Sequence, residues 1–390
     1  MKIAVVCDSF KGSLTSKDAC AAVKDGLLRC NKNFEVLSLP FADGGEGTSR
    51  CFYDILGGQL RKAAVHDPLL REITAEYTVL PDGTAVIDIA SASGLTLLKS
   101  SERDAVKVSS LGSGELICDA AEHGAKHIIL GLGGSATTDA GTGILYAIGM
   151  RFFSEDGAEV LPDGQNMIRV KKIRRTENFE RFKDIKFTLA CDVTNPLCGE
   201  NGAAYVFSPQ KGASKNDAKL LDDGLRNIGE IFEKASGKKI INLPGAGAAG
   251  GIGGGLSAFL NCELQSGFDV LARAASLEDK IRRSDAVITG EGKTDRQTLF
   301  GKLPKRVSDI AEKFGVPCIL LSGDVENDIS AEKLGVCEIH KIKEDGISLE
   351  HCMKNAASLL SERALAIGKN SKIINKQYSR KQEKMRENER

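Results

Sequence analysis

Residues 127–143, which read HIILGLGGSATTDAGTG, constrain the fold of this chain more than any other segment. The segment begins as a short apolar run typical of a buried parallel strand, and it continues as a loop of glycines, small hydroxyl residues and one carboxylate, Asp139. In open α/β sheets such loops lie at the carboxyl ends of strands, where ligands bind. Glycines also let backbone N–H groups approach an anion closely. We therefore expect an anion-binding loop that includes Gly133, Gly134 and Ser135; the alternative is a tight turn without a ligand.

Short apolar runs of the same kind recur near both ends of the chain, with amphipathic stretches between them. The strongest strand candidates are residues 3–7, 34–39, 127–132, 285–289, 318–321 and 338–342. Alternating strands and helices predict an α/β protein with a parallel, doubly wound sheet. Because early and late strands share this pattern, we expect one sheet to be built from both ends of the chain.

The middle of the chain has a different pattern. Residues 73–90 predict a hairpin around Pro81, Asp82 and Gly83, and residues 187–193 and 203–207 resemble further strands. We therefore predict a mixed α/β domain inserted into the first one, with a ligand cleft between the two. The expected boundaries are 1–64 and 272–370 for the first domain, whose sheet the strand at 127–132 could join, 65–271 for the insertion, and 371–390 for a basic, disordered tail.

Composition limits the possible functions. The 53 basic and 53 acidic residues cancel, so no overall field attracts nucleic acid or a membrane surface. Five per cent aromatic residues and no Trp argue against base-stacking surfaces. The 11 cysteines include no CxxC pair, which favours reduced thiols and a cytoplasmic location. No apolar run reaches the ~18 residues of a membrane span. Small molecules are thus the expected partners, and the oligomeric state stays open.

Polar loops follow several of the predicted strands. Lys11 stands at a helix start after the first strand, where the alternative role of the loop is to cap the helix. The loop after the second strand places two acids among three glycines, and the loop after residues 285–289 alternates acids with a lysine and is followed by Gly301-Lys302. Acids in such loops are candidate ligands for a divalent ion, namely Asp43, Glu46, Glu291 and Asp295.

The GKT at 292–294 is not a P-loop, because that motif needs a glycine at position 287, where this chain has Val. Residues 244–255, PGAGAAGGIGGG, contain a formal GxGxxG at Gly245, Gly247 and Gly250. This motif could indicate a dinucleotide site, a phosphate nest or a closely packed helix start. The preceding run is short and ends in Pro244, which weakens the dinucleotide interpretation. Asp192 and Asn195 follow a strand ahead of Pro196, where they could face a cleft or form an Asx turn.

Taken in order, these segments resemble the type I glycerate kinase family. The resemblance rests on DSFKGSL at 8–14, ADGGEGT at 42–48, residues 127–143, CDVTNPL at 191–197, PQKGA at 209–213, PGAGAAGGIGGGL at 244–256 and GEGKTDRQTLFGK at 290–302. It implies a Rossmann- or flavodoxin-like domain with an inserted α/β domain. It also implies transfer of the γ-phosphoryl group of ATP, with magnesium, to a hydroxyl of D-glycerate, giving 2-phosphoglycerate or 3-phosphoglycerate.

The resemblance implies a role for each loop. The expected catalytic residues are Asp192, which would accept the hydroxyl proton, and Lys11. The expected substrate contacts are Arg71, Asn195, Lys293 and Ser9. The expected nucleotide contacts are Gly133, Gly134, Ser135, Gly247, Gly250, Lys211 and Lys302. The expected magnesium ligands are Asp43, Glu46, Glu291 and Asp295.

The chain departs from the family pattern at three places. Thr138 and Ala140 replace residues of the usual TNDGG, Leu70 replaces the glycine of DPLGR, and Lys293 replaces the arginine of GEGRID. A lysine cannot hold a carboxylate through two parallel hydrogen bonds, so substrate affinity could be weaker. Two alternative functions remain at this point: an NAD(P)-dependent oxidoreductase that uses the glycines at 245–250, and a metabolite-binding protein without catalytic activity.

Overall fold

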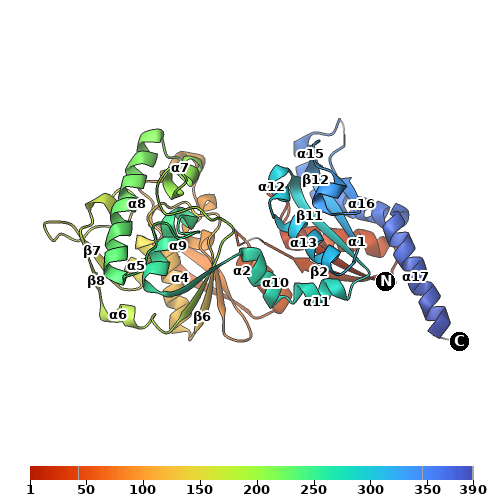
Figure 1. Ribbon diagram of the computed structural model, residues 1–390, viewed down its shortest axis with the longest axis horizontal. Helices are drawn as coiled ribbons and strands as arrows, with labels where there is room; N and C mark the ends of the chain where they lie inside the picture. Colours follow the sequence, from red (N-terminus) through yellow and green to blue (C-terminus); the bar gives the residue numbers. More distant parts are fainter. Residues whose placement is uncertain (43, 345, 389–390) are drawn as a thin grey trace. The chain divides into compact units, whose positions relative to one another are not determined.

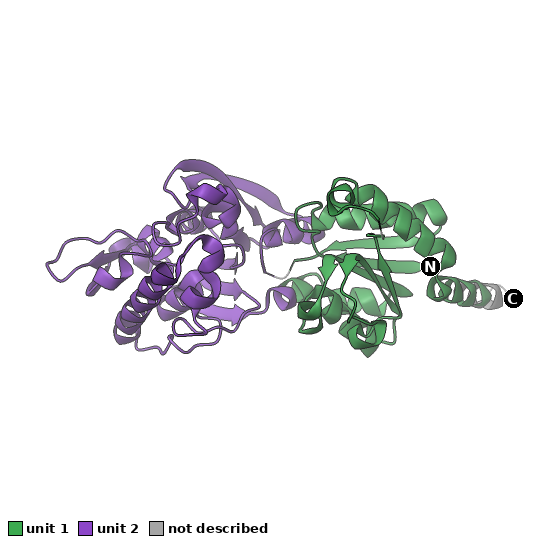
Figure 2. Ribbon diagram, turned by 90° about the horizontal axis from the view of Figure 1, so that it is seen from above, with its two compact units in different colours: residues 1–43, 271–390 green, residues 44–270 purple. Residues whose placement is uncertain are grey.

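A computed structural model describes residues 1–42, 44–344 and 346–388. The chain forms two compact units, coloured separately in Figure 2. Unit 1 comprises Met1–Asp43 and Leu271–Arg390, and unit 2 comprises Gly44–Val270. Both units are α/β, as the sequence predicts.

Unit 1 is built around a five-stranded parallel sheet in the order β13-β12-β11-β1-β2. Its strands are β1 (Lys2–Cys7), β2 (Glu35–Pro40), β11 (Ala286–Thr294), β12 (Cys318–Val325) and β13 (Glu338–Lys341). Numbered within the unit, this is the order 2-1-3-4-5 of flavodoxin-like sheets. The sheet is therefore assembled from both ends of the chain, as the shared pattern of the early and late strands predicts.

Helices cover both faces of this sheet, so its central strands are continuous apolar runs. The helices of unit 1 are α1 (Ser16–Cys30), α11 (Leu277–Arg282), α12 (Arg296–Leu299), α13 (Leu303–Lys313), α14 (Ala331–Leu334), α15 (Leu349–Lys354), α16 (Ala356–Asn370) and α17 (Lys372–Asn388), with α10 (Gly267–Ala274) leading in from unit 2. α1 and α16 lie side by side (Figure 1). A Cβ on Gly26 of α1 would lie 2.1 Å from the backbone oxygen of Ser361, so only glycine permits this close approach.

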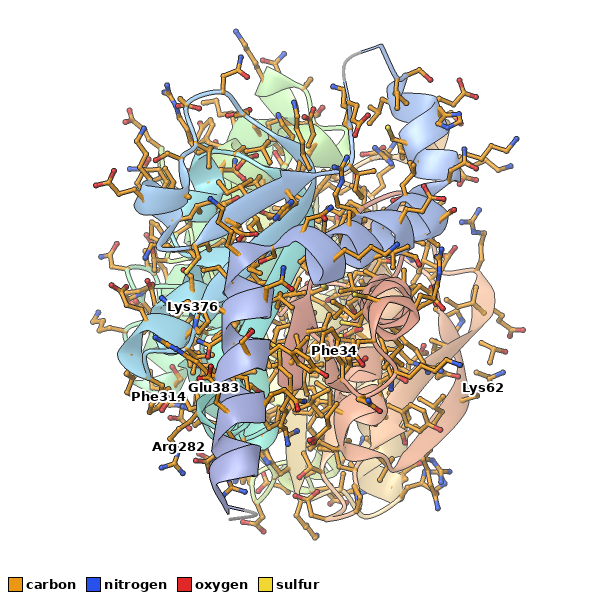
Figure 3. The ribbon with its side chains drawn as sticks, turned by 90° about the vertical axis from the view of Figure 1, so that its right-hand side faces the viewer. Phe34, Lys62, Arg282, Phe314, Lys376 and Glu383 are labelled. Carbon is orange, nitrogen blue, oxygen red and sulfur yellow. The ribbon has the colours of Figure 1, made fainter. Side chains whose placement is uncertain are left out.

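The basic segment at the C-terminus is helical, and the prediction of a disordered tail is wrong for the described residues. Ile374 of α17 is fully buried in the core of unit 1. The ring of Tyr378 meets that of Phe34 edge-on at 5.8 Å. Figure 3 shows Phe34 beside α17, which carries Lys376 and Glu383. Ile373, Ile374 and Tyr378 thus anchor a helix that is otherwise mostly polar.

Unit 2 contains a six-stranded sheet in the order β10-β9-β6-β5-β4-β3, with a separate β7–β8 hairpin. β10, β9, β6 and β5 run parallel, and β4 pairs antiparallel with both of its neighbours, β5 and β3. The strands are β3 (Gln59–His66), β4 (Glu72–Val79), β5 (Ala85–Asp88), β6 (His127–Gly131), β7 (Met150–Phe153), β8 (Lys172–Arg175), β9 (Lys186–Ala190) and β10 (Asn261–Gln265). The predicted hairpin at 73–90 is confirmed as β4 and β5.

The α-helices of unit 2 are α2 (Thr48–Leu56), α3 (Ala90–Ser93), α4 (Leu111–Glu122), α5 (Thr142–Ala147), α6 (Glu177–Glu180), α7 (Ala203–Phe207), α8 (Lys215–Ser236) and α9 (Ala248–Phe259). Short 3-10 helices cover Leu95–Leu97, Ser100–Glu102, Met167–Arg169 and Pro209–Lys211. Neighbouring residues on β4 point to opposite faces of the sheet. Tyr77 donates a hydrogen bond to Asp119 of α4, and Thr78 bonds to Ser49 of α2, so α4 and α2 cover opposite faces.

Three expectations about the middle of the chain need correction. Unit 2 begins at Gly44 and not at 65, because β3 pairs with β4. The strand at 127–131 joins the sheet of unit 2, since both of its neighbours, β5 and β9, come from the middle of the chain. Residues 203–207 form helix α7, in which two buried alanines precede two exposed residues, instead of the alternating burial of a strand.

None of the helices in the described part of the chain combines the length and apolar character needed to cross a membrane.

Candidate active site

Unit 1 has a cavity at the carboxyl edge of its sheet, where the strand order reverses between β1 and β11. Ligands of open α/β sheets bind at such a switch point. The cavity has a volume of about 660 Å³, within the usual range for small-molecule sites. Its lining includes six of the residues singled out in the sequence: Ser9, Lys11, Glu291, Lys293, Asp295 and Lys302.

The loop after β1 is held in place by backbone hydrogen bonds. Asp8 N donates to Gly290 O of β11 (2.9 Å), and Phe10 N donates to Leu14 O (2.9 Å). Phe10 is buried, which turns the next residue, Lys11, to the surface. Thr15 caps α1 by accepting a hydrogen bond from Asp18 N (3.1 Å), so capping does not require the polar residues earlier in the loop.

Glu291 is a buried carboxylate in the extended end of β11. It is 5% exposed and accepts a hydrogen bond from Thr298 Oγ1 (2.7 Å). Burial raises the pKa of Glu291, while Thr298, Thr294 and Lys302 act in the opposite direction. Asp295 caps α12 and lies 3.3 Å from Lys302 Nζ. The cavity therefore offers two neighbouring carboxylates next to a cation.

The cations of this cavity differ in how they are paired. Lys293 lies 2.8 Å from Glu326, and Lys343 lies 2.9 Å from Asp324. Lys11 is exposed and forms no ion pair with any residue that the structure describes. Lys11 is consequently the cation most available to an incoming anion.

The predicted magnesium ligands that the structure describes belong to both units. Glu291 and Asp295 share the cavity of unit 1, Glu46 belongs to unit 2, and Asp43 lies outside the described residues. Within residues 1–42, 44–344 and 346–388, no cluster of three His, Cys, Asp or Glu side chains could hold a metal. Magnesium commonly uses one or two protein carboxylates together with substrate phosphates. Glu291 and Asp295 fit that smaller requirement.

In unit 2, the glycine-rich loop after β6 packs tightly against the loop that precedes α2. Gly133 N donates to Gly44 O (3.0 Å), and a Cβ on Gly133 would lie 2.5 Å from Gly45 Cα. Gly134 has a φ of +78°, which strongly favours glycine. A Cβ on Gly134 would lie 3.8 Å from Glu46 Cβ. Two of the motifs found in the sequence, residues 42–48 and 127–143, thus supply adjacent residues.

Lys211 is buried beneath this loop and forms hydrogen bonds with it. Its side chain is buried, and Nζ donates to Ser135 Oγ (2.9 Å) and to Thr137 O (2.6 Å). Burial lowers the pKa of Lys211 to about 7, although the nearby Asp139 acts to raise it. The structure therefore brings Lys211 to the predicted loop, in contact with its backbone.

Two buried carboxylates of unit 2 hold the loops in place. Asp139 accepts from Ser110 N (2.9 Å) and Ser110 Oγ (2.7 Å), which ties its loop to the start of α4. Asp88 accepts from Gly47 N (2.9 Å) and Ser49 N (3.0 Å), and burial raises its pKa to about 7. Asp88 is not among the residues predicted from the sequence, although an acid that ends an apolar strand marks it there.

The loop after β9 lies next to the alanine- and glycine-rich segment. Asp192 is exposed, and Asn195 O accepts a hydrogen bond from Gly247 N (3.0 Å). A Cβ on Gly250 would lie 2.0 Å from Thr137 O, and one on Gly247 would lie 2.3 Å from Pro196 O. Close packing between loops accounts for both glycines without a ligand, and their nucleotide contacts remain a prediction.

The GxGxxG at 245–250 does not follow a strand. The residues before it form turns, and helix α9 starts at Ala248, inside the motif. A dinucleotide fingerprint requires a strand that leads directly into the glycine turn. The dinucleotide interpretation therefore lacks its structural context.

Arg71 ends the tight turn between β3 and β4 and is held by two carboxylates. Its Nε lies 2.6 Å from Asp67 Oδ2, and its Nη1 lies 2.9 Å from Glu102 Oε1. The hydrogen bond with Asp67 is the largest cause that raises the pKa of Arg71, and the contact with Glu102 acts in the same direction. About half of the side chain is exposed, so part of the guanidinium remains accessible.

Unit 1 thus has a flavodoxin-like sheet with lysines and carboxylates at its switch point, where open α/β sheets bind ligands, and unit 2 is a second α/β unit with a glycine-rich loop. Comparisons with known proteins define the family. The family model described as "Glycerate kinase family" matches residues 3–372, so the chain belongs to this family.

Individual relatives agree with this membership. The chain is 40% identical over 330 residues to a glycerate 2-kinase of Escherichia coli (strain K12), covering 84% of this chain and 87% of that protein. It is 38% identical over 364 residues to a glycerate kinase of Halalkalibacterium halodurans, covering 93% and 96%. A crystal structure assigned as glycerate kinase 2 from Salmonella typhimurium LT2 superposes with a TM-score of 0.83 at 34% identity, covering 94% of this chain and 97% of that one.

Proposed function

We propose that this protein is an ATP-dependent glycerate kinase that transfers the γ-phosphoryl group to a hydroxyl of D-glycerate and releases ADP. The observation that carries the proposal is the family match over residues 3–372. The lysines and carboxylates that line the cavity of unit 1 support the proposal, because phosphoryl transfer depends on groups that position and neutralise phosphate charge. We further propose 2-phosphoglycerate as the product, because a relative at 40% identity is a glycerate 2-kinase.

Phosphoryl transfer depends on positioning and on neutralisation of charge more than on covalent chemistry. Within unit 1, we assign phosphate contacts to Lys11 and Lys302, and contacts with glycerate to Ser9 and Lys293. Glu291 and Asp295 would hold magnesium, which neutralises phosphate charge when it is bound. Burial disfavours the charged form of Glu291, and a bound cation would reverse that preference.

Within unit 2, we assign nucleotide contacts to Gly133, Gly134 and Ser135, whose loop Lys211 supports. Arg71 and Asn195 would contact glycerate. Asp192 would accept the proton of the attacked hydroxyl, for which its exposed place after β9 is suitable. We also propose a cytoplasmic location, on the basis of the cysteine content.

The test is to incubate the protein with ATP, magnesium and D-glycerate and to couple the product directly to enolase. Enolase accepts the 2-phosphate, so a signal without added mutase identifies 2-phosphoglycerate. A signal that needs mutase identifies 3-phosphoglycerate. Omission of D-glycerate is the control for ATP hydrolysis by itself. If no ADP is released that depends on glycerate, the proposal is wrong.

A further inference from the structure

The cavity of unit 1 is lined by both polar and apolar residues. The polar lining includes the lysines and carboxylates described above. The apolar lining, called the apolar side here, consists of Phe10, Ile342, Leu349, Cys352, Met353 and Ala356. It comes from the loop after β1, the end of β13 and the region of α15 and α16. A ligand that fills this cavity should therefore combine an anionic part with an apolar part.

The apolar side is accessible because two large side chains of α15 remain uncovered. Leu349 is 61% exposed and Met353 is 38% exposed. They are four residues apart and so lie on the same face of the helix. Cys352, by contrast, is buried and anchors α15 to the unit. A Cβ on Gly12 would lie 2.9 Å from Met353 Cε, so the methionine reaches the loop that presents Lys11.

Glycerate alone does not account for this lining. It is a small, fully polar anion, and an apolar wall offers it no favourable contact. A cavity of about 660 Å³ is also larger than such a ligand needs. A nucleotide has both required parts, since its base presents a flat apolar face and its phosphates carry negative charge.

We infer that the cavity of unit 1 binds the nucleoside end of ATP, with the base against Leu349, Met353 and Ile342 and the phosphates toward Lys11 and Lys302. This inference rests on the proposed function for the identity of the nucleotide. It assigns to α15 a role in nucleotide binding that the sequence motifs do not indicate, because α15 lies outside all of them. The exposed apolar pair on α15 is then a ligand contact that is uncovered when no nucleotide is bound.

The test removes the apolar wall without changing charge. The double variant Leu349→Ser, Met353→Ser is compared with the double variant Leu161→Ser, Leu220→Ser. The control residues are similarly exposed, at 70% and 39%, and lie in unit 2 outside the proposed sites. Binding of ATP and of inorganic tripolyphosphate is measured by calorimetry on the full chain, and KM is measured for ATP and for D-glycerate. Thermal unfolding checks that each variant is folded.

We expect the wall variant to weaken ATP binding at least about tenfold, because apolar contacts with the base are lost. Binding of tripolyphosphate and the KM for D-glycerate should change less than about twofold, and the control variant should match the unchanged protein. Equal effects on ATP and tripolyphosphate, an effect confined to D-glycerate, or no effect at all would each overturn the inference. If the unchanged protein binds ATP but does not phosphorylate glycerate, the proposed function fails, while the ATP measurements still decide the inference.

Discussion

Replacement of Lys211 by Met tests whether the glycine-rich loop of unit 2 rests on a buried amine. The side chain is 3% exposed and donates to Ser135 Oγ and to Thr137 O. Methionine has a similar length and no charge, so it removes the hydrogen bonds and the titration together. A phosphate contact at the surface would give a different response, because an exposed lysine titrates near its ordinary value.

The expected magnitude follows from the pKa. Burial lowers the pKa of Lys211 from the ordinary 10.5 to about 7 in the folded protein. Between these values the unfolded chain binds one more proton than the folded chain, so the free energy of unfolding rises with pH. The contribution of Lys211 to the free energy of unfolding is fully present above the pKa of the lysine in the unfolded chain. It is lost as the pH falls through the pKa of Lys211 in the folded protein. Integration from pH 7 to pH 9 gives about 2 kcal/mol.

Urea unfolding of the unchanged protein and of Lys211→Met, followed by circular dichroism at pH 7, 8 and 9, measures the difference. We expect the stability of the unchanged protein relative to the variant to increase by about 2 kcal/mol over this range. At pH 7 the free energies of unfolding of the unchanged protein and of Lys211→Met should be closer. The variant loses two hydrogen bonds, each worth about 1 kcal/mol, but it also loses a buried charge, which offsets that loss.

The control is Lys219→Met on α8, where the side chain is 74% exposed. The difference between this variant and the unchanged protein should not depend on pH. A Lys211→Met difference that is equally constant from pH 7 to pH 9 would refute the argument that the amine is buried in a neutral form.

Three further predictions address other residues. Burial raises the pKa of Asp88 from 3.8 to about 7, so its contribution to stability is present below pH 4 and is lost as the pH rises to about 7. Asp88→Asn should remove this dependence, worth at most about 4 kcal/mol, and parallel pH curves for variant and unchanged protein would contradict it. Asp192→Asn should lower kcat at least about a hundredfold in the enolase-coupled assay, and a near-normal rate would exclude its role as the base. Gly250→Ala should destabilise the protein by at least about 2 kcal/mol in urea unfolding, because the residue has a φ of +68° and a Cβ would lie 2.0 Å from Thr137 O. An unchanged urea midpoint would show that this contact can relax.

The sequence alone determined the class of the fold and most of the strands. Apolar runs such as residues 3–7 and 318–321 are buried on both faces of a parallel sheet, and that burial leaves a continuous apolar pattern in the sequence. The hairpin at 73–90 was equally clear, because alternation and a turn of Pro, Asp and Gly are local signals. Family membership followed from seven collinear motifs, which together carry more information than any one of them.

Only the tertiary structure decided which strands pair and what each loop residue contacts. The strand at 127–131 has the pattern of any buried parallel strand, and its place in unit 2 depends on partners distant in the sequence. Lys211 looks like a surface phosphate ligand until packing buries its amine under Thr137 O. The tail at 372–388 is mostly polar by composition, and its helix is held in place because Ile373, Ile374 and Tyr378 pack against the core of unit 1. The local sequence pattern determines which face of a helix or strand is apolar, whereas long-range packing determines which other element covers that face. The pKa of a buried group depends on the residues that pack around it, so the sequence pattern alone does not determine it.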